Sequence, residues 1–285
     1  MKKALSLLLV ATICLLSFSS CAEFSKVKVN GTKIDNEVYY YFEDLYDGDK
    51  TQINNALSRY MAINTEFSIQ SLTLSSVQKS ELSKRVNNLW QLYSVHYTNL
   101  GISKQTIYKI ETSKFYEDTL LDYYYGPNGT SPVSEDTIKK YFKENYIAIN
   151  FATDYLFNIN ETGAMVSMPD SEKAAIINNF SRSAELVNTG SIIETATDKE
   201  VHNTIINAKN DGSFPSGFYN EAKKLEINGA STIIIGDYIF LVQRIDVFDE
   251  TYGYYESYRT ECLRAMKGNE FNTLVNQWSQ NYKVN

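Results

Sequence analysis

The sequence contains few of the residues that most often build catalytic centres and cross-links. It has only 2 histidines and 3 cysteines in 285 residues, with 13 glycines and 4 prolines. The scarcity of glycine and proline excludes collagen-like and low-complexity chains, and a composition of 43% apolar and 21% charged residues excludes a disordered one. Because this length buries a core without cross-links, we expect a globular protein of one large or two modest domains.

The cysteines are placed so that no intrachain disulfide is expected in the mature protein. Cys14 lies inside an N-terminal apolar run and Cys21 lies just after it, which leaves Cys262 without a partner. Cys262 is at helical spacing from Tyr255 and Met266. We therefore interpret it as a small buried hydrophobic residue, with a catalytic thiol as the alternative.

Motifs for nucleotide, zinc and serine-hydrolase chemistry are missing as well. The sequence has no glycine-rich phosphate loop, no His-Glu-x-x-His, no Cys-x-x-Cys and no Gly-x-Ser-x-Gly. We expect neither a metal nor a cofactor. The chain has 27 Lys and Arg against 34 Asp and Glu, a formal net charge of −7. This acidic balance argues against binding the phosphate backbone of nucleic acid.

The N-terminus carries the clearest functional signal in the sequence. Lys2 and Lys3 precede an apolar run, Ala4 to Leu16, that is too short to span a bilayer comfortably and is typical of a secretory signal peptide. The run ends in Ser17-Phe18-Ser19-Ser20-Cys21, which resembles a bacterial lipobox, in which the cysteine is acylated and becomes the mature N-terminus.

This pattern predicts an exported lipoprotein. We expect residues 1–20 to be the signal peptide, Cys21 to be the lipidation site, and residues 21–26 to form a tether. Two or more acyl chains hold a protein stably on a bilayer, so the expected location is the extracytoplasmic face of the cell membrane. The alternative is an ordinary secretory signal that is cleaved near Cys21.

Helical periodicity dominates the region that follows the tether. Val27 to Ile34 predicts a small hairpin with Asn30-Gly31 at its turn, and Asp35 is a candidate helix cap. Apolar residues at spacings of three and four predict helices through most of residues 36–125. One helix has an apolar stripe that we expect to pack into a core, formed by Leu82, Val86, Leu89, Trp90, Tyr93, Tyr97 and Leu100.

The pattern changes near residue 147. Residues 147–158 predict a strand, residues 170–188 a helix, residues 199–232 loop and short helix, and residues 231–247 a β-hairpin that turns at Gly236-Asp237. From Tyr252 onward one long helix is expected, bent at Gly268 and packed through Trp278 against the N-terminal helices.

The order of several motifs carries a family resemblance. Val29 to Ile34 looks like the opening hairpin of the PrsA/SurA family of extracytoplasmic foldases, and Val133 to Tyr141 looks like its linker helix. Phe218 to Ala222, followed by Leu225 and Gly229, resembles the helix and turn of a parvulin domain, with one extra residue. The pattern from Phe271 to Trp278 fits the family's returning helix.

The resemblance implies an α+β protein. A helical chaperone domain like the SurA N-terminal domain is then built from both chain ends, residues 27–145 and 252–285. A parvulin-like α+β domain, residues 146–251, is inserted between them. In the family this inserted domain is a peptidyl-prolyl isomerase.

This sequence departs from the family at its site residues. Parvulin domains have one histidine in an Ala-x-His pattern and another after a glycine, and here Asp154 and Tyr238 stand at those positions. We interpret them as a degenerate catalytic site, although a hydrogen bond between the two would make a reshaped one. The remaining histidines, His96 and His202, are interpreted as surface or structural residues.

Two aromatic residues are candidates for substrate binding. Phe214 and Phe218 lie where the resemblance places a proline pocket, with ordinary core aromatics as the alternative interpretation. The chain also has 22 tyrosines, including Tyr39-Tyr40-Tyr41 and Tyr123-Tyr124-Tyr125. Their amphipathic rings suit an aromatic-lined binding groove, or else they are half-buried helix faces.

The functional expectation is a lipid-anchored foldase or chaperone that binds unfolded or newly exported polypeptides. One alternative is an active, divergent peptidyl-prolyl isomerase. Another is a surface lipoprotein that binds a specific glycan or assembly partner.

Overall fold

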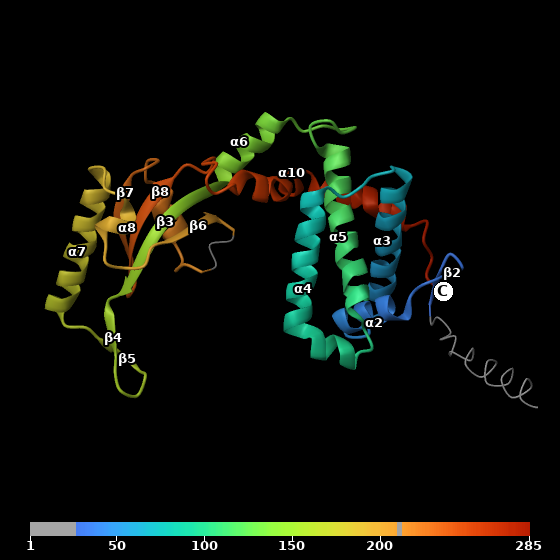
Figure 1. The fold of residues 1–285 in the computed structure, drawn as a ribbon, viewed down its shortest axis with the longest axis horizontal. Coiled ribbons are helices and arrows are strands. Elements are labelled where there is room, and N and C mark those ends of the chain that lie inside the picture. The colour runs from blue at the N-terminus through green and yellow to red at the C-terminus, as the bar shows by residue number, and fades with distance from the viewer. Residues whose placement is uncertain (1–26, 210–212) are drawn as a thin grey trace, which may run out of the picture. The chain divides into compact units, whose positions relative to one another are not determined.

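The computed structural model describes residues 27–209 and 213–285. In these ranges the chain forms two compact units (Figure 1). Among the described residues, the helical unit comprises those up to Leu121 together with Gly268–Asn285, and the sheet unit comprises those within Asp122–Lys267. The expected signal peptide, the lipidated Cys21 and the tether lie outside the described residues.

The helical unit begins with a short hairpin and continues with helices. Asn30 and Gly31 have positive φ angles, 48° and 76°, as a tight hairpin turn requires. Asp35 caps the first helix by accepting a hydrogen bond from the Glu37 backbone N–H. The elements are β1 (Lys28–Val29), β2 (Thr32–Lys33), α2 (Asn36–Leu45), α3 (Lys50–Ile69), α4 (Ser76–Asn99) and α5 (Lys104–Tyr125).

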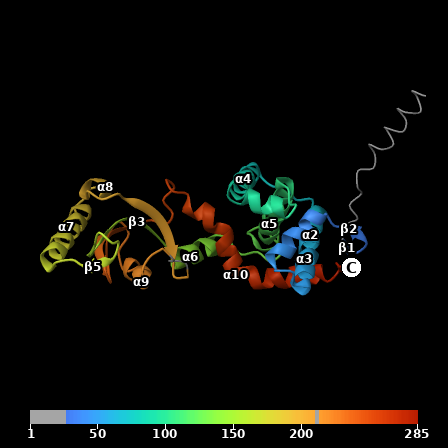
Figure 2. The same ribbon diagram turned by 90° about the horizontal axis from the view of Figure 1, so that it is seen from below.

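Ion pairs and hydrogen bonds tie these helices together. Helices α3, α4 and α5 lie side by side (Figures 1 and 2). Arg59 of α3 pairs with Glu117 of α5 at 2.9 Å. The buried Glu111 of α5 lies between Arg85 of α4, at 2.5 Å, and Lys114, at 2.6 Å. Because the carboxylate has two cationic partners, its burial carries no uncompensated charge.

Both ends of the described part of the chain build the helical unit. Lys28 and Asn285 exchange two backbone hydrogen bonds, of 3.2 and 2.9 Å. In the C-terminal part of helix α10 (Tyr254–Ser279), Phe271 and Val275 are completely buried. Trp278, which we expected to be a packing anchor, is only half-buried and contacts Phe271 edge-on at 6.2 Å.

The expectation that the whole apolar stripe of α4 packs into a core is wrong for its second half. Leu82 and Val86 are buried, but Tyr93 is 50% exposed and Trp90 and Tyr97 are only half-buried. The spacing of apolar residues in the sequence indicates that their side chains share one face of a helix. This spacing does not indicate whether a neighbouring helix or strand extends far enough to cover that face.

The sheet unit contains a four-stranded antiparallel sheet with strand order β6-β3-β8-β7. Together with the helices it confirms the expected α+β fold class. Its elements, up to the start of α10, are α6 (Glu135–Asn145), β3 (Tyr146–Tyr155), β4 (Phe157–Ile159), β5 (Met165–Ser167), α7 (Asp170–Asn188), α8 (Ile193–Ala196), β6 (His202–Asn207), α9 (Phe218–Ala222), β7 (Ala230–Ile235) and β8 (Tyr238–Ile245).

The expectation of loop and short helix across residues 199–232 is wrong for β6. This strand pairs with β3 from Tyr146↔Asn207 to Phe151↔His202. It lies at the edge of the sheet, and because both of its ends are polar, its sequence does not alternate between apolar and polar residues. Pairing with the buried neighbour β3 therefore decides its conformation.

The two faces of the sheet are packed differently. One face is covered by α7 and has a core of small and aliphatic side chains with one aromatic ring, formed by Ala152, Leu156, Phe180, Ala184, Val187, Ile193, Ala230, Ile239 and Leu241. The other face is covered by the short helix α9 and has a core of Ile147, Ile149, Ile206, Phe218, Tyr219, Ala222, Ile233, Phe240 and Val242.

Helix α6 and the first part of α10 belong to the sheet unit. Phe142 of α6 is completely buried and its ring lies 5.0 Å from Tyr146, 5.6 Å from Phe248 and 5.5 Å from Tyr255. Arg259 of α10 binds Glu135 at 3.0 Å.

The compact units thus divide inside α5 and α10. The domain boundaries expected from the sequence, 145/146 and 251/252, are a different division and stay a prediction. In the part of the chain that the structure describes, no helix combines the length and the apolar character needed to cross a bilayer.

Candidate functional site

Seven aromatic side chains form a continuous row on the α9 side of the sheet, which we call the aromatic face. Its members come from the start of β4, from β3 and β8, from the edge strand β6, and from the loop before α9. They are Phe157, Tyr155, Tyr238, Phe240, Phe214, Phe151 and His202.

The register of the strands explains why these residues share one face. Tyr155 is directly opposite Tyr238, and Phe151 is directly opposite both Val242 and His202. Directly opposed residues of an antiparallel pair point to the same side, and every second residue along a strand does so too. Phe151 and Tyr155 on β3 therefore lie on the same side as Tyr238.

Ring contacts connect the row from end to end. The ring centroids of Phe157 and Tyr155 are 4.9 Å apart, and those of Tyr155 and Tyr238 are 5.5 Å apart. Tyr238 stacks on Phe240 at 6.4 Å. Phe214 lies 5.9 Å from Phe240 and 5.0 Å from Phe151. These separations are typical of favourable aromatic pairs.

Much of this face is accessible to solvent. Tyr155 is 46% exposed and Tyr238 is 38% exposed, and Phe151, Phe157 and Phe214 are half-buried. Tyr and Phe rings that are left partly exposed in a continuous row form an apolar surface of the kind that marks interaction sites. This surface offers rings for apolar contact, and the tyrosine hydroxyls offer hydrogen bonds.

The predicted substrate-binding pair Phe214 and Phe218 is brought together. Their rings stack at 4.2 Å with an interplanar angle of 8°. Phe218 is 0% exposed and belongs to the core under α9. In this arrangement only Phe214 is open to contact with a ligand, and a role of the pair in binding stays a prediction.

The two predicted site positions, Asp154 and Tyr238, lie on opposite faces of the sheet. Asp154 is paired in register with Ile239, whose side chain is in the core under α7, whereas Tyr238 is paired with Tyr155. The two side chains therefore do not form a hydrogen-bonded pair.

Asp154 has other partners. It forms an ion pair with Lys199 at 2.7 Å and accepts a hydrogen bond from the Tyr155 backbone N–H at 2.8 Å. The hydrogen bond to Asp154 raises the pKa of Lys199. These contacts explain the carboxylate as part of the sheet's packing at its rim.

The remaining titratable candidates are not arranged for catalysis. His96 is exposed and contacts Asp44 at 2.9 Å, and His202 is exposed at the β6 end of the aromatic face, so both are surface residues as predicted. Cys262 is completely buried, and burial raises the pKa of its thiol to about 11, which keeps it protonated at neutral pH. Among the described residues, no three His, Cys, Asp or Glu side chains gather into a potential metal site.

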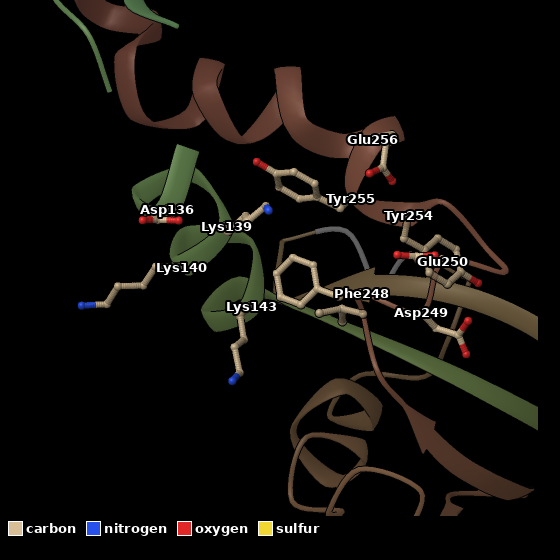
Figure 3. Close-up of a pocket in the computed structure, with 11 residues that line it drawn as sticks. Asp136, Lys139, Lys140, Lys143, Phe248, Asp249, Glu250, Tyr254, Tyr255 and Glu256 are labelled. Carbon is tan, nitrogen blue, oxygen red and sulfur yellow. The ribbon is translucent and has the colours of Figure 1, made fainter. Parts of the chain in front are cut away.

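A separate groove of about 470 Å³ lies between α6 and the loop that joins β8 to α10 (Figure 3). Three lysines of α6, Lys139, Lys140 and Lys143, lie on one side, and carboxylates of the loop, including Asp249 and Glu250, lie on the other. The groove thus carries charges of both signs, without a nucleophile next to a base.

Aromatic rings also line the groove. The Lys139 ammonium lies 5.6 Å from the centre of the Tyr255 ring. Burial raises the pKa of Tyr254 to about 12, so its hydroxyl stays protonated and neutral. A groove of this kind has hydrogen-bond donors and acceptors but no arrangement that points to one reaction.

Of the aromatic face, only Tyr238 and Phe214 were predicted as site residues from the sequence. Phe151, Tyr155 and Phe157 alternate along β3 and into β4 with a spacing of two or four residues, which is the periodicity of one side of a strand. This signal was present in the sequence. Only the register with β8 shows that it joins Tyr238 and Phe240 in one row.

A search with protein-family models found no match to this chain, and neither did a search of curated proteins. Solved structures do match. The foldase protein PrsA from Streptococcus pneumoniae is 11% identical, with 84% of this chain and 87% of that chain covered and a TM-score of 0.43. PrsA from Lactococcus lactis is 12% identical, with 90% of each chain covered and a TM-score of 0.38.

A further match is one of the structures described as SurA-like chaperones of Campylobacter jejuni. It is 11% identical, with 91% of this chain and 97% of that chain covered and a TM-score of 0.31. These solved structures are PrsA foldases and a SurA-like chaperone. The order of the sequence motifs resembles the same class.

Proposed function

We propose that this protein is a lipid-anchored extracytoplasmic chaperone of the PrsA/SurA type. It holds newly exported, unfolded polypeptides, and its isomerase site is degenerate. The observation that carries the proposal is the aromatic face, in which Tyr155 and Tyr238 remain substantially exposed within a continuous row of rings.

The chemistry of this face suits a holding function. Large rings contribute contact area at a low cost in side-chain entropy, and they accept apolar segments of many sequences. A chaperone must bind without strong sequence preference, and a row of rings with few fixed polar groups meets that need. Charged side chains are absent from the seven members of the face.

The same face lacks what prolyl isomerisation requires. Rotation about a peptide bond has a barrier of about 18–20 kcal/mol, and a catalyst must bind the twisted amide more tightly than the planar one. Fixed polar groups around the amide supply that preference. Of the two candidate positions, Asp154 pairs with Lys199 on the other side of the sheet, which leaves Tyr238 alone on this side.

The location follows from the N-terminal pattern of the sequence. Acylation of Cys21 would hold the mature chain at the extracytoplasmic face of the membrane. Replacement of Cys21 by Ala tests this directly, because labelling of the chain with palmitate in growing cells must disappear. Palmitate labelling that persists in this variant contradicts the anchor.

The central experiment measures holding and catalysis with the same purified mature protein. Holding is measured as suppression of light scattering when reduced, denatured lysozyme is diluted from denaturant. Catalysis is measured in a protease-free assay of prolyl isomerisation in a short peptide. We expect aggregation to be suppressed at about equimolar protein and isomerisation to proceed at the uncatalysed rate.

The other outcomes separate the alternatives. Strong acceleration of isomerisation identifies an active, divergent isomerase. Absence of both activities contradicts the chaperone proposal and favours a surface lipoprotein with a specific glycan or assembly partner.

A further inference from the structure

A small two-stranded arm extends from the aromatic face. Strands β4 (Phe157–Ile159) and β5 (Met165–Ser167) pair only with each other among the described residues, and their hairpin projects beyond the end of the four-stranded sheet (Figure 1). At its base, the Phe157 ring contacts Tyr155 at 4.9 Å and Tyr238 at 6.4 Å. The arm therefore continues the aromatic face.

One side of the arm is apolar and open to solvent. Ile159 lies directly opposite Met165, and Phe157 lies directly opposite Ser167, so these side chains share one side. Ile159 is 67% exposed and Met165 is 59% exposed. Glu161, in the turn, is the only charged residue from 156 to 168.

The opposite side of the arm faces helix α7. Asn158 donates a hydrogen bond to Glu172 of α7 at 3.5 Å. This contact holds the arm on its Asn158 side and leaves the other side, with Ile159 and Met165, open to solvent.

The turn of the arm is fixed by its own hydrogen bonds. The side-chain oxygen of Asn160 accepts bonds from the backbone N–H groups of Thr162 and Ala164, at 3.0 and 2.9 Å, and from the Thr162 hydroxyl at 2.7 Å. Gly163 has a φ angle of 81°, which only glycine adopts without strain. The turn is thus preorganised, although an isolated two-stranded hairpin is marginally stable in water.

The backbone of the arm has hydrogen-bonding groups that point outward. Asn160 donates its backbone N–H to the Ala164 carbonyl at 3.0 Å, which makes Asn160 and Ala164 a hydrogen-bonded pair. Pairs of the two kinds alternate in an antiparallel ladder, so the N–H and C=O groups of Phe157 and Ile159 point away from β5. These groups form an open strand edge.

We propose that the outer edge of β4 is a docking strand for an extended, uncharged segment of a client polypeptide. The client pairs its backbone with Phe157 and Ile159 and rests alternate side chains on Ile159, Met165 and the aromatic face. Continuity with that face and the near absence of charge favour this occupant over a second copy of the chain or a charged peptide. The inference rests on the proposed chaperone function and names the conformation and charge of the segments that it holds.

The test uses the full mature chain and two probe peptides of one sequence, fluorescein-labelled repeats of Val-Thr-Tyr. In the second peptide, alternate backbone nitrogens are methylated, which removes the donors on one edge and keeps every side chain. Fluorescence anisotropy measures binding. We expect the unmodified peptide to bind at least about tenfold more tightly than the methylated one, as strand pairing requires. Equal binding of the two peptides overturns the docking strand.

A variant of the arm is compared with a matched control. Ile159→Ser with Met165→Ser should weaken binding of the unmodified peptide at least about tenfold. Leu92→Ser with Val95→Ser removes a similarly exposed apolar pair from α4 and should leave binding unchanged. The arm variant and the unaltered protein could bind the peptide equally while both still suppress lysozyme aggregation. That result overturns the docking strand but leaves the chaperone function standing. Failure of the unaltered protein in both assays overturns the chaperone itself.

A cross-linking experiment identifies the occupant. A photoreactive benzoylphenylalanine at position 159 should cross-link to the unmodified peptide, whereas the same group at position 92 should not. A cross-link from position 159 to a second copy of the chain, or to no molecule, overturns the proposal.

Discussion

The two faces of the four-stranded sheet are built from alternate residues of the same strands, yet they differ in how much of each face a helix covers. On one face, helix α7 (Asp170–Asn188) covers Ala152, Ile239 and Leu241 so that they are almost completely buried. On the other face, α9 has only 5 residues, and the rings beyond it stay partly exposed. We therefore expect the covered face to determine the stability of the unit, and the open face carries the proposed binding surface.

This comparison also explains the choice of side chains. The covered face uses small and aliphatic residues, because a long helix can approach the sheet closely there. The open face uses aromatic residues, whose contacts with each other stabilise the row without a covering element. The same rings would supply contact area to a client in the function proposed above.

The largest effect is expected on the covered face. Phe180 of α7 is buried in its core, so Phe180→Ala removes a ring and leaves a cavity. We expect a loss of about 3–5 kcal/mol in the free energy of unfolding, measured by urea denaturation. Client binding should fall only to the extent that the protein unfolds. A loss below about 1 kcal/mol would show that α7 does not complete the core.

On the open face, substitutions should reduce client binding more than they reduce the stability of the fold. Tyr155→Ala with Tyr238→Ala should reduce the affinity for an unfolded client roughly tenfold, because each ring contact contributes about 0.5–1.5 kcal/mol. The cost in stability should be clearly smaller than for Phe180→Ala, because both rings are already partly exposed. Unchanged client binding, measured by fluorescence anisotropy, contradicts the assignment of the aromatic face.

The sequence predicted the covered face better than the open one. The helix over residues 170–188 and the closing hairpin were predicted from periodicity and turn residues, and both are confirmed. The edge strand β6 was missed, because its pairing with β3 is a long-range contact that leaves no local pattern. The aromatic face depends mainly on a second long-range pairing, that of β3 with β8. It joins rings from positions 151 to 240 that only the strand register brings together.

A smaller effect is expected at the rim of the covered face, where Asp154 pairs with Lys199. The hydrogen bond to Asp154 raises the pKa of Lys199 above its ordinary 10.5. A raised folded-state pKa means that the pair's contribution to stability is fully present below 10.5 and is lost as the pH rises through the folded-state value.

The pH dependence is measured by comparison with Asp154→Asn. Both side chains are partly exposed, so screening by solvent limits the contribution to about 0.5 kcal/mol or less. The difference in urea midpoint between the two proteins should be present at neutral pH and should disappear in strongly alkaline solution. A difference that is independent of pH contradicts an ionic role for Asp154.

The last variant is expected to have no effect on prolyl isomerisation, and it tests the geometry of the two faces most directly. The double change Asp154→His with Tyr238→His places a histidine at each of the two positions that the sequence resemblance assigns to the parvulin histidines. Two groups that stabilise the same twisted amide must reach it from one side of the sheet. In this register Asp154 lies opposite Ile239 on the covered face, and Tyr238 lies opposite Tyr155 on the open face. We therefore expect no acceleration in the protease-free prolyl-peptide assay.

The matched control is Thr153→His with Tyr238→His, because Thr153 lies opposite Phe240 and so on the open face with Tyr238. This variant places both imidazoles on one side, where a gain of activity is geometrically allowed. If the variant with histidine at 154 and 238 accelerates isomerisation while the control does not, then the assignment of Asp154 to the covered face is wrong. Acceleration by the control alone would show that the face on which each histidine lies, and not only the number of histidines, decides whether such a variant catalyses the reaction.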